Sequence, residues 1–230
     1  MKTNFITSII LLFIVSSCIK EDIDVPPIVC DCPPQSQLIG TDSIMTGTYL
    51  GVPINGESEK VYSSLQKLGD TLDLKYINIV GNIFTDLIML QDRIPLYQSI
   101  FLDEQKGTDT GVQISFTDKQ VSNIFLNSGK NLAQWPSGSN AETAIRKGDD
   151  VNILYSKLLK IKQISAYRNK FERISMFTKD MKTKYDPILK NSPTWYFAYT
   201  FGNKLMDVVH IDFKDGKVIK IKVQHYQRYW

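Results

Sequence analysis

Two stretches of the chain alternate apolar and polar residues with the period of a β-strand. In the second stretch, every other residue from 209 to 213 is large and apolar, as in a strand with one buried face. Asp215 and Gly216 follow, and this pair suits the positive φ angles of a tight turn. The pattern predicts a β-hairpin over 209–223, and a matching pattern predicts another over 112–126.

Two other stretches space their apolar residues three or four positions apart, which is typical of amphipathic helices. The first helix is expected at about 57–68 and the second at about 149–161. Between the first helix and the first hairpin, Gly81-Asn82 separates two runs of β-forming residues. This pair predicts a further two-residue hairpin turn.

These stretches occur twice, in the same order. Three pairs of blocks match, at offsets of 93, 87 and 97 residues: 62–68 with 155–161, 77–89 with 164–176, and 112–126 with 209–223. The repeat predicts an α+β fold of two tandem units, each a helix packed on an antiparallel sheet of four to five strands. The units are expected at 40–136 and 137–230, because a loop-forming stretch lies between them. Chance similarity of two halves, with one long helix over 150–182, is the alternative.

The first residues have the features of a secretory leader. Lys2 is followed by an apolar stretch over 5–15, which is shorter than the about 20 residues that a membrane-spanning helix needs. The run V-S-S-C ending at Cys18 resembles the lipobox of bacterial lipoproteins. The resemblance implies that 1–17 is a signal peptide and that Cys18 is acylated, so that lipid anchors the protein to a membrane. A plain signal peptide with an incidental cysteine is the alternative.

The residues after Cys18 refine the expected location. Lys20, Glu21 and Asp22 resemble the export signal of Bacteroidota surface lipoproteins. This resemblance implies an outer-membrane lipoprotein displayed at the cell surface, and the periplasmic face of that membrane is the alternative.

Residues 18–39 predict an extended tether between the anchor and the body. They contain four prolines and four acidic residues, a composition that favours stiff, extended backbone. Cys30 and Cys32 lie inside this tether. Exposed thiols or a local disulfide are expected there, and a bond to another chain is the alternative.

Composition and charge add a hypothesis about partners. The chain has 230 residues, of which 43% are hydrophobic and 22% charged, as in ordinary globular proteins. The net charge of +3 is too small to indicate nucleic-acid binding. Residues 40–144 hold 7 basic and 12 acidic residues, whereas 145–230 hold 18 and 8. The basic half suggests a lipopolysaccharide, an anionic glycan or an acidic protein as partner. Attraction between the halves is the alternative.

The last predicted strand carries the candidate binding residues. With a period of two, the apolar residues Ile219, Ile221 and Val223 face one side. The other side is expected to present Lys220, Lys222, Gln224, Tyr226, Arg228 and Trp230. Interleaved cations and aromatic rings suit an anionic partner, but charged residues also protect an edge strand from aggregation.

The body resembles several families of binding proteins. Gly56-x-Ser58-x-x-Val61 with Leu68-Gly69 is similar to the opening of small outer-membrane assembly lipoproteins. Tandem helix-plus-sheet units resemble β-lactamase inhibitory proteins, and a single unit resembles cystatins. These resemblances imply protein binding rather than catalysis.

Candidate catalytic chemistry is sparse. The only histidines are His210 and His225, and the chain has neither a G-x-S-x-G motif nor a glycine-rich phosphate loop. No catalytic residue, metal site or cofactor is predicted. The expected function is therefore that of a lipid-anchored, non-catalytic binding protein. An inhibitor or immunity protein that masks a toxin or hydrolase is one alternative, and an envelope hydrolase with an unrecognised site is another.

Overall fold

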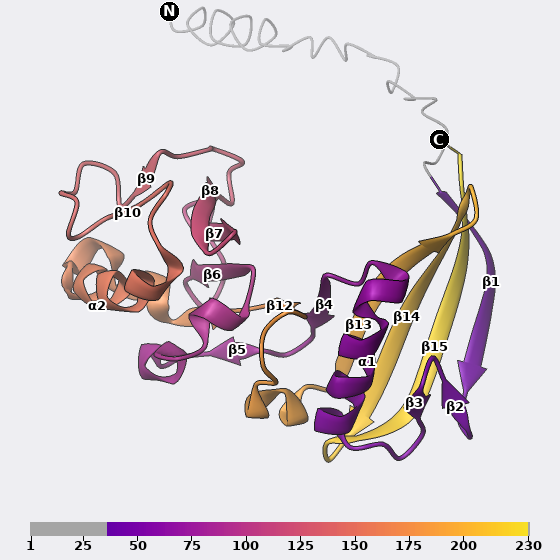
Figure 1. Cartoon of the computed structure of the whole chain (residues 1–230). Coiled ribbons are helices and arrows are strands. Elements are labelled where there is room, and N and C mark those ends of the chain that lie inside the picture. The colour runs from indigo at the N-terminus through magenta and orange to yellow at the C-terminus, as the bar shows by residue number, and fades with distance from the viewer. Residues whose placement is uncertain (1–35, 230) are drawn as a thin grey trace, which may run out of the picture. The chain divides into compact units, whose positions relative to one another are not determined.

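The structure is a computed structural model that describes residues 36–229. Two large antiparallel sheets and two α-helices make up most of the regular structure of these residues (Figure 1). The mixed α+β class predicted from the sequence is confirmed. Several predicted features lie outside the described residues: the leader, Cys18, the motif Lys20-Glu21-Asp22, the tether cysteines and Trp230.

The first large sheet has six strands in the order β1-β15-β14-β13-β4-β12, and all neighbours are antiparallel. Its strands are β1 (Ser36–Ile44), β4 (Tyr76–Ile79), β12 (Thr178–Asp180), β13 (Thr194–Phe201), β14 (Leu205–Lys214) and β15 (Lys217–Arg228). The second has five antiparallel strands in the order β5-β11-β6-β7-β8. Its strands are β5 (Ile83–Phe84), β6 (Ser99–Asp103), β7 (Val112–Thr117), β8 (Gln120–Leu126) and β11 (Arg173–Ser175).

Short elements complete the fold. Two small two-stranded sheets pair β2 (Thr48–Tyr49) with β3 (Val52–Pro53), and β9 (Gln134–Trp135) with β10 (Ile145–Arg146). The α-helices are α1 (Ser58–Leu72) and α2 (Leu154–Gln163). The 3-10 helices are η2 (Leu87–Leu90), η3 (Ile94–Leu96), η4 (Val151–Ile153), η5 (Ser165–Phe171) and η6 (Pro187–Asn191).

The two large sheets have equivalent strand orders. The run β15-β14-β13-β4-β12 in the six-stranded sheet corresponds to β8-β7-β6-β11-β5 in the five-stranded sheet. Individual hydrogen bonds follow the same correspondence. The amide of Phe116 donates to the carbonyl of Gln98 at 2.7 Å, and the amide of Phe213 donates to that of Pro193 at 2.7 Å. Only β1, at the edge of the six-stranded sheet, has no counterpart among the described strands.

Both predicted hairpins are confirmed, as β7–β8 and as β14–β15. They have the same turn geometry and a bulge at the same position. The turn residues Asp118 and Lys119 have φ angles of 49° and 62°, and Asp215 and Gly216 have 53° and 73°. Positive φ at both positions is what a type I′ turn requires. Each hairpin also has a register shift just before its phenylalanine, at Ser115/Phe116 and at Asp212/Phe213.

Each helix is bonded to the hairpin of the other half of the chain. The amide of Ser58, at the start of α1, donates to the carbonyl of Gly216 at 2.9 Å. The amide of Val151, in the turn that leads into α2, donates to the carbonyl of Lys119 at 2.9 Å. Helices near both predicted positions are therefore present, but each meets a hairpin turn that belongs to the other half of the chain.

The two tandem units at 40–136 and 137–230 are not confirmed, because each large sheet takes strands from both halves. The segment 76–84 contributes β4 to one sheet and β5 to the other, and 173–180 contributes β11 and β12 in the same way. These two segments pair with each other, β4 with β12 and β5 with β11. Local periodicity identified the strands, but the choice of partner depends on register between segments far apart in the sequence.

Two further local predictions are wrong for the same reason. No hairpin forms at Gly81-Asn82, because β4 and β5 enter different sheets instead of pairing with each other. The side chain of Asn82 is buried and donates to the carbonyl of Met176 at 2.7 Å, so this turn is fixed by the other half of the chain. One long helix over 150–182 is not seen either, since α2 ends at Gln163.

Helix α1 covers one face of the six-stranded sheet (Figure 1). Its residues Val61, Tyr62 and Leu65 are fully buried. The Tyr62 ring meets Trp195 of β13 edge-on, with ring centroids 6.4 Å apart. Burial of apolar area at about 25 cal/mol per Å² holds the helix to this face. The opposite face of the sheet has no such cover among the described residues.

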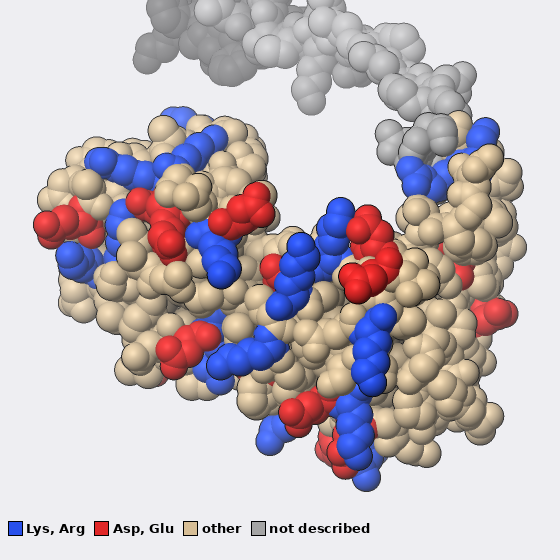
Figure 2. All heavy atoms as spheres, in the orientation of Figure 1, with Lys and Arg blue, Asp and Glu red and all other residues tan. Residues whose placement is uncertain are grey.

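Charge is mixed over the surface that carries α1. Figure 2 shows acidic and basic side chains side by side on this face, with no large area of a single sign. Because the two halves are interleaved in both sheets, the difference in net charge between 40–144 and 145–230 does not divide the molecule into an acidic and a basic part.

Candidate binding surface

The face of the six-stranded sheet opposite α1 carries a row of polar and aromatic side chains. The strand register places six residues side by side, in the order Ser43, Lys222, His210, Tyr196, Asn78 and Thr178. Each is exposed or half-buried, whereas Ile211 and Ile221, on the α1 side, are 1% and 0% exposed. The surface formed by this row and its neighbours is called the open face below.

The candidate binding residues that the structure describes lie on the open face, as the period-two pattern predicts: Lys220, Lys222, Tyr226 and Arg228. Ile219 was expected on the buried side, but it is 44% exposed. It is the extra residue of the bulge, since Phe213 pairs with Val218 and Asp212 pairs with Lys220. Such a bulge breaks the strict alternation for one position.

Strand β15 is not an edge strand. Strand β1 pairs with it along eight residue pairs, from Ser36 with Arg228 to Ile44 with Ile221. Edge protection therefore does not account for the charged residues on β15, because its backbone groups are already bonded on both sides. This pairing was not predicted, because residues 36–39 were expected to belong to the tether.

An aromatic stack stands at the centre of the row. The rings of Tyr196 and His210 are nearly parallel at 20°, with centroids 5.5 Å apart. His210 Nε2 also lies 3.1 Å from the side-chain oxygen of Gln224. Burial and the neighbouring charge of Lys222 lower the pKa of His210 below its ordinary value, which favours a neutral ring at pH 7. Tyr196 itself is 36% exposed and presents its outer surface to solvent.

Beside this stack lies a shallow pocket of about 550 Å³. On the open face its walls are the aromatic Tyr76 and Tyr196 and the amide of Asn78, and Ala198 and Val208 form a low floor. Lys75 lies at its rim. Aromatic walls with a few polar groups are typical of a site for a small or chain-like ligand.

The lysines of the open face are free to bind an anion. Among residues 36–229, no carboxylate lies within 4.0 Å of the ammonium of Lys220 or Lys222. Asp212 pairs with Lys220 across the strands, but its carboxylate accepts a hydrogen bond from Thr194 at 2.9 Å. The face thus combines unpaired cations, an exposed aromatic ring and neutral amides.

Sequence reasoning assigned no binding role to four members of this surface: Tyr76, Asn78, Tyr196 and His210. Strand periodicity places His210 on the polar side of its strand, and it could have placed Tyr196 in the same way. It could not have placed β4 beside β13, because that pairing joins residues more than 100 positions apart.

His225 lies on the other face of the sheet, where both of its ring nitrogens are engaged. Nδ1 is 2.7 Å from Asp207 and Nε2 is 3.2 Å from Asp42 of β1. Asp207 also accepts a hydrogen bond from the hydroxyl of Tyr199 at 3.0 Å. Hydrogen bonds to Asp207 and Asp42 raise the pKa of His225. This arrangement fixes β1 to the sheet and leaves neither nitrogen to activate a nucleophile.

Comparison with family models, with curated proteins and with solved structures finds no match. None of the helices within 36–229 is long and apolar enough to cross a bilayer. The same residues contain no group of three or more His, Cys, Asp or Glu side chains arranged to hold a metal ion.

Proposed function

We propose that this chain is a lipid-anchored binding protein of the outer membrane, displayed at the cell surface, and that its open face holds an anionic glycan. The observation that carries the proposal is the row in which the unpaired cation Lys222 lies beside the stacked rings of His210 and Tyr196. The resemblance of the segment ending at Cys18 to a lipobox supports the anchor, and the motif after it supports surface display.

A glycan fits the chemistry of this face better than a hydrophobic partner does. Sugar rings present flat C–H surfaces that pack on an exposed aromatic ring, here Tyr196, and hydroxyls that bond to amides such as Asn78 and Gln224. Carboxylate, phosphate or sulfate groups on the sugar would meet Lys220 and Lys222. Polysaccharides and the sugar phosphates of lipopolysaccharide share this chemistry.

The tether explains how the face reaches its partner. Residues 18–39 combine paired prolines with acidic residues, which favour an extended chain between the lipid and the body. Strand β1 takes up residues 36–39 at the end of this predicted tether and forms the edge of the sheet whose open face would bind.

Binding to polygalacturonate tests the proposal. The full-length protein in detergent would be captured on a sensor surface, and polygalacturonate, purified lipopolysaccharide and neutral dextran would be passed over it. We expect binding of at least one anionic polymer and little binding of dextran. Affinity should fall steeply from about 0.1 M to about 1 M salt, because the Debye length shrinks from about 10 Å to about 3 Å.

Two variants and one control locate the binding. Lys220→Glu/Lys222→Glu should weaken binding at least about tenfold, and Tyr196→Ala should weaken it by a similar factor at high salt, where stacking dominates. Lys67→Glu changes an exposed lysine of α1 on the opposite face and should leave affinity unchanged. Full affinity in the double lysine variant, or equal loss in the Lys67 variant, would contradict the proposal.

A further inference from the structure

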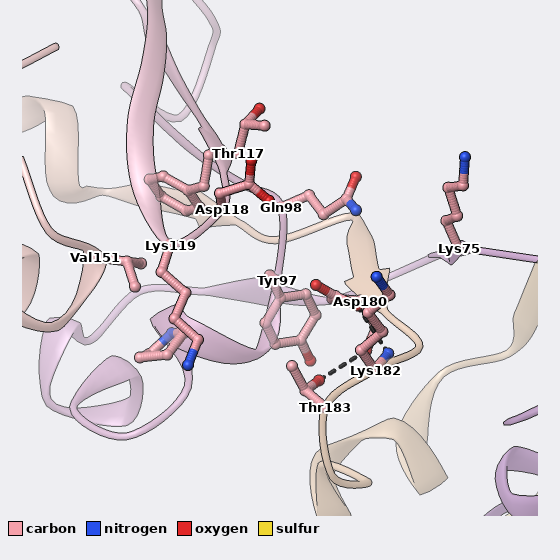
Figure 3. Close-up of a pocket in the computed structure, with 12 residues that line it drawn as sticks. Lys75, Tyr97, Gln98, Thr117, Asp118, Lys119, Val151, Asp180, Lys182 and Thr183 are labelled. Atoms are coloured by element: carbon pink, nitrogen blue, oxygen red, sulfur yellow. Dashed lines mark hydrogen bonds between the residues drawn. The ribbon is translucent and has the colours of Figure 1, made fainter. Parts of the chain in front are cut away.

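A second pocket of about 500 Å³ lies at the turn of the β7–β8 hairpin (Figure 3). The turn itself forms one wall with Thr117, Asp118 and Lys119. The segment after β12 forms the opposite wall, and the lining residues it provides are Asp180, Lys182 and Thr183. The pocket is thus framed by chain segments of both halves, and it is separate from the open face.

The floor of this pocket is apolar, and its lining carries three lysines and two aspartates, Asp118 and Asp180. Tyr97, Phe116 and Val151 line the floor, and all are at least nine-tenths buried. Lys75, Lys119 and Lys182 stand around the rim. Lys75 pairs with Asp73 at 3.3 Å, but within 36–229 neither Lys119 nor Lys182 has a carboxylate within 4.0 Å.

Lys119 lies at this rim in a backbone conformation that a lysine rarely adopts. Its φ of 62° and the 49° of Asp118 lie in the left-handed region, which suits glycine better than a lysine. The equivalent turn has Gly216 at the position of Lys119. Strained non-glycine residues of this kind are found more often at functional positions than elsewhere.

A buried cation lies directly behind the pocket wall. Lys179 is 0% exposed, and its ammonium donates to the Tyr62 hydroxyl at 2.9 Å, to the Asp180 carbonyl at 3.1 Å and to the Thr183 hydroxyl. No carboxylate of the described chain lies within 4.0 Å of this ammonium. Burial lowers the pKa of Lys179 to about 8, so the group still carries its charge at pH 7. Asp180 and Thr183, which hold it, also line the pocket.

The equivalent place in the other hairpin has a different character. There a pocket of about 490 Å³ is lined by Phe213, Asp215 and Lys190, with Pro193 at the position of Gln98. A single lysine lines it, and Lys190 lies against the turn, since a Cβ at Gly216 would meet its Cβ at 3.5 Å. Of these two hairpin pockets, the one at the β7–β8 turn has an apolar floor and three lysines on its rim.

We infer that the pocket at the β7–β8 turn binds a small organic anion with an apolar, flat body. Its ring would pack on Tyr97, Phe116 and Val151, and its acidic group would lie between Lys119 and Lys182. The charge of Lys179 behind the wall adds to the attraction, although the nearby charges of Asp180 and Asp186 offset part of it. This site lies away from the open face and takes a smaller ligand. The inference can therefore be tested separately from the proposal of glycan binding.

Calorimetric titration with naphthalene-1-sulfonate tests the inference. The full-length protein in detergent would be titrated with this aromatic anion and with the neutral naphthalene-1-methanol, after subtraction of the heat measured in detergent alone. We expect saturable binding of the sulfonate, and binding of the alcohol at least about tenfold weaker. No saturable heat for the sulfonate would overturn the inference, and so would equal affinity for the two compounds.

Charge reversal locates the site. Lys119→Glu/Lys182→Glu should weaken sulfonate binding at least about tenfold, whereas Lys67→Glu should stay within about twofold of the parent protein. Equal losses in both variants would overturn the inference, since they would show attraction by overall charge. If circular dichroism shows that the double variant is unfolded, Lys119→Ala and Lys182→Ala replace it. Each should then weaken binding about threefold or more, and unchanged affinity in both would overturn the inference.

Discussion

The two large sheets have the same strand order, and their hairpins share turn geometry and bulge position. The equivalent faces of the two sheets nevertheless carry different side chains. In the six-stranded sheet the central row presents Lys222, His210 and Tyr196 to solvent. At the equivalent positions the five-stranded sheet has Phe125, Gln113 and Phe101. The cation of the first row is replaced by an apolar ring in the second.

The chain covers part of this face of the five-stranded sheet, at Asp103, whereas Gln113 in the central row is exposed. Asp103, which corresponds to the exposed Ala198, is 0% exposed. It accepts hydrogen bonds from Thr108 and from the Asn127 side chain, at 2.8 and 3.0 Å, and Lys170 lies 3.9 Å away. Nearby, the guanidinium of Arg173 lies 5.8 Å from the Phe101 ring centre. The five-stranded sheet thus uses this part of the face for internal contacts, whereas the equivalent position in the six-stranded sheet is exposed.

The largest expected effect concerns the shared core. Trp195→Ala, in β13, should lower the free energy of unfolding by about 3–5 kcal/mol, because Trp195 is fully buried against Phe213 and Tyr62. Urea unfolding should still show one transition by circular dichroism and by tryptophan fluorescence, since segments 76–84 and 173–180 pair in both sheets. Tyr196→Ala, one residue away on the open face, should cost no more than about 1 kcal/mol. Two separate transitions would show that the sheets are independent.

The second prediction compares Asp103 with Ala198, its equivalent in the six-stranded sheet. Asp103→Ala should cost about 3 kcal/mol, because it leaves the donors of Thr108 and Asn127 without their acceptor, although Lys170 keeps its closer partner Glu104 at 2.6 Å. Ala198→Asp, at the equivalent exposed position, should change stability by no more than about 0.5 kcal/mol. Chemical denaturation of both variants measures the difference. Similar losses would mean that the two faces are not differently covered.

The third prediction concerns the effect of acid on the stability that Asp103 contributes. Burial alone would raise the pKa of Asp103, but hydrogen bonds from Thr108 and Glu104 and the charge of Lys170 outweigh it, and the pKa lies below its ordinary value of 3.8. The folded pKa is lower than the unfolded one, so this contribution is complete above pH 3.8 and is lost as pH falls through the folded value. Asp103→Ala should lack this part of the acid dependence when unfolding is followed between about pH 5 and about pH 2.

The two turns should respond in opposite directions to exchange of their residues. Lys119→Gly should stabilise the protein by up to about 1 kcal/mol, because glycine adopts the φ of 62° without strain. Gly216→Lys should destabilise it by about 1 kcal/mol or more, since φ is 73° and the new Cβ would lie 3.5 Å from that of Lys190. Thermal unfolding measures both. A destabilised Lys119→Gly variant would show that the Lys119 side chain stabilises the turn.

The smallest effect concerns β1, the strand with no counterpart. The pKa of His225 is expected above its ordinary value of 6.5, because of hydrogen bonds to Asp207 and Asp42. The folded pKa is raised, so the stabilising contribution is complete below the unfolded pKa and is lost as pH rises through the folded value. NMR titration of the ring should show a lower pKa in Asp42→Asn than in the parent protein. An unchanged value would mean that β1 does not contribute through this histidine.

The sequence by itself determined the local elements and their buried faces. Alternation and the Asp-Gly pair were sufficient for the β14–β15 hairpin, because a tight turn and a two-residue period depend only on near neighbours. Helical spacing was sufficient for α1, although the helix extends to Leu72, beyond the predicted end. The leader and the resemblance around Cys18 likewise depend on contiguous residues, and they remain predictions.

Only the tertiary structure decided which segments meet. Strand partners are chosen by hydrogen bonds and side-chain packing between residues more than 100 positions apart, and no local pattern records that choice. The interleaving of the halves, the pairing of β1 with β15 and the place of Asn78 beside Tyr196 all follow from it. The period-two pattern could place Lys220 and Lys222 on a polar face. Whether that face was covered by the chain itself or left free depended on distant segments, and so it could be seen only in the folded protein.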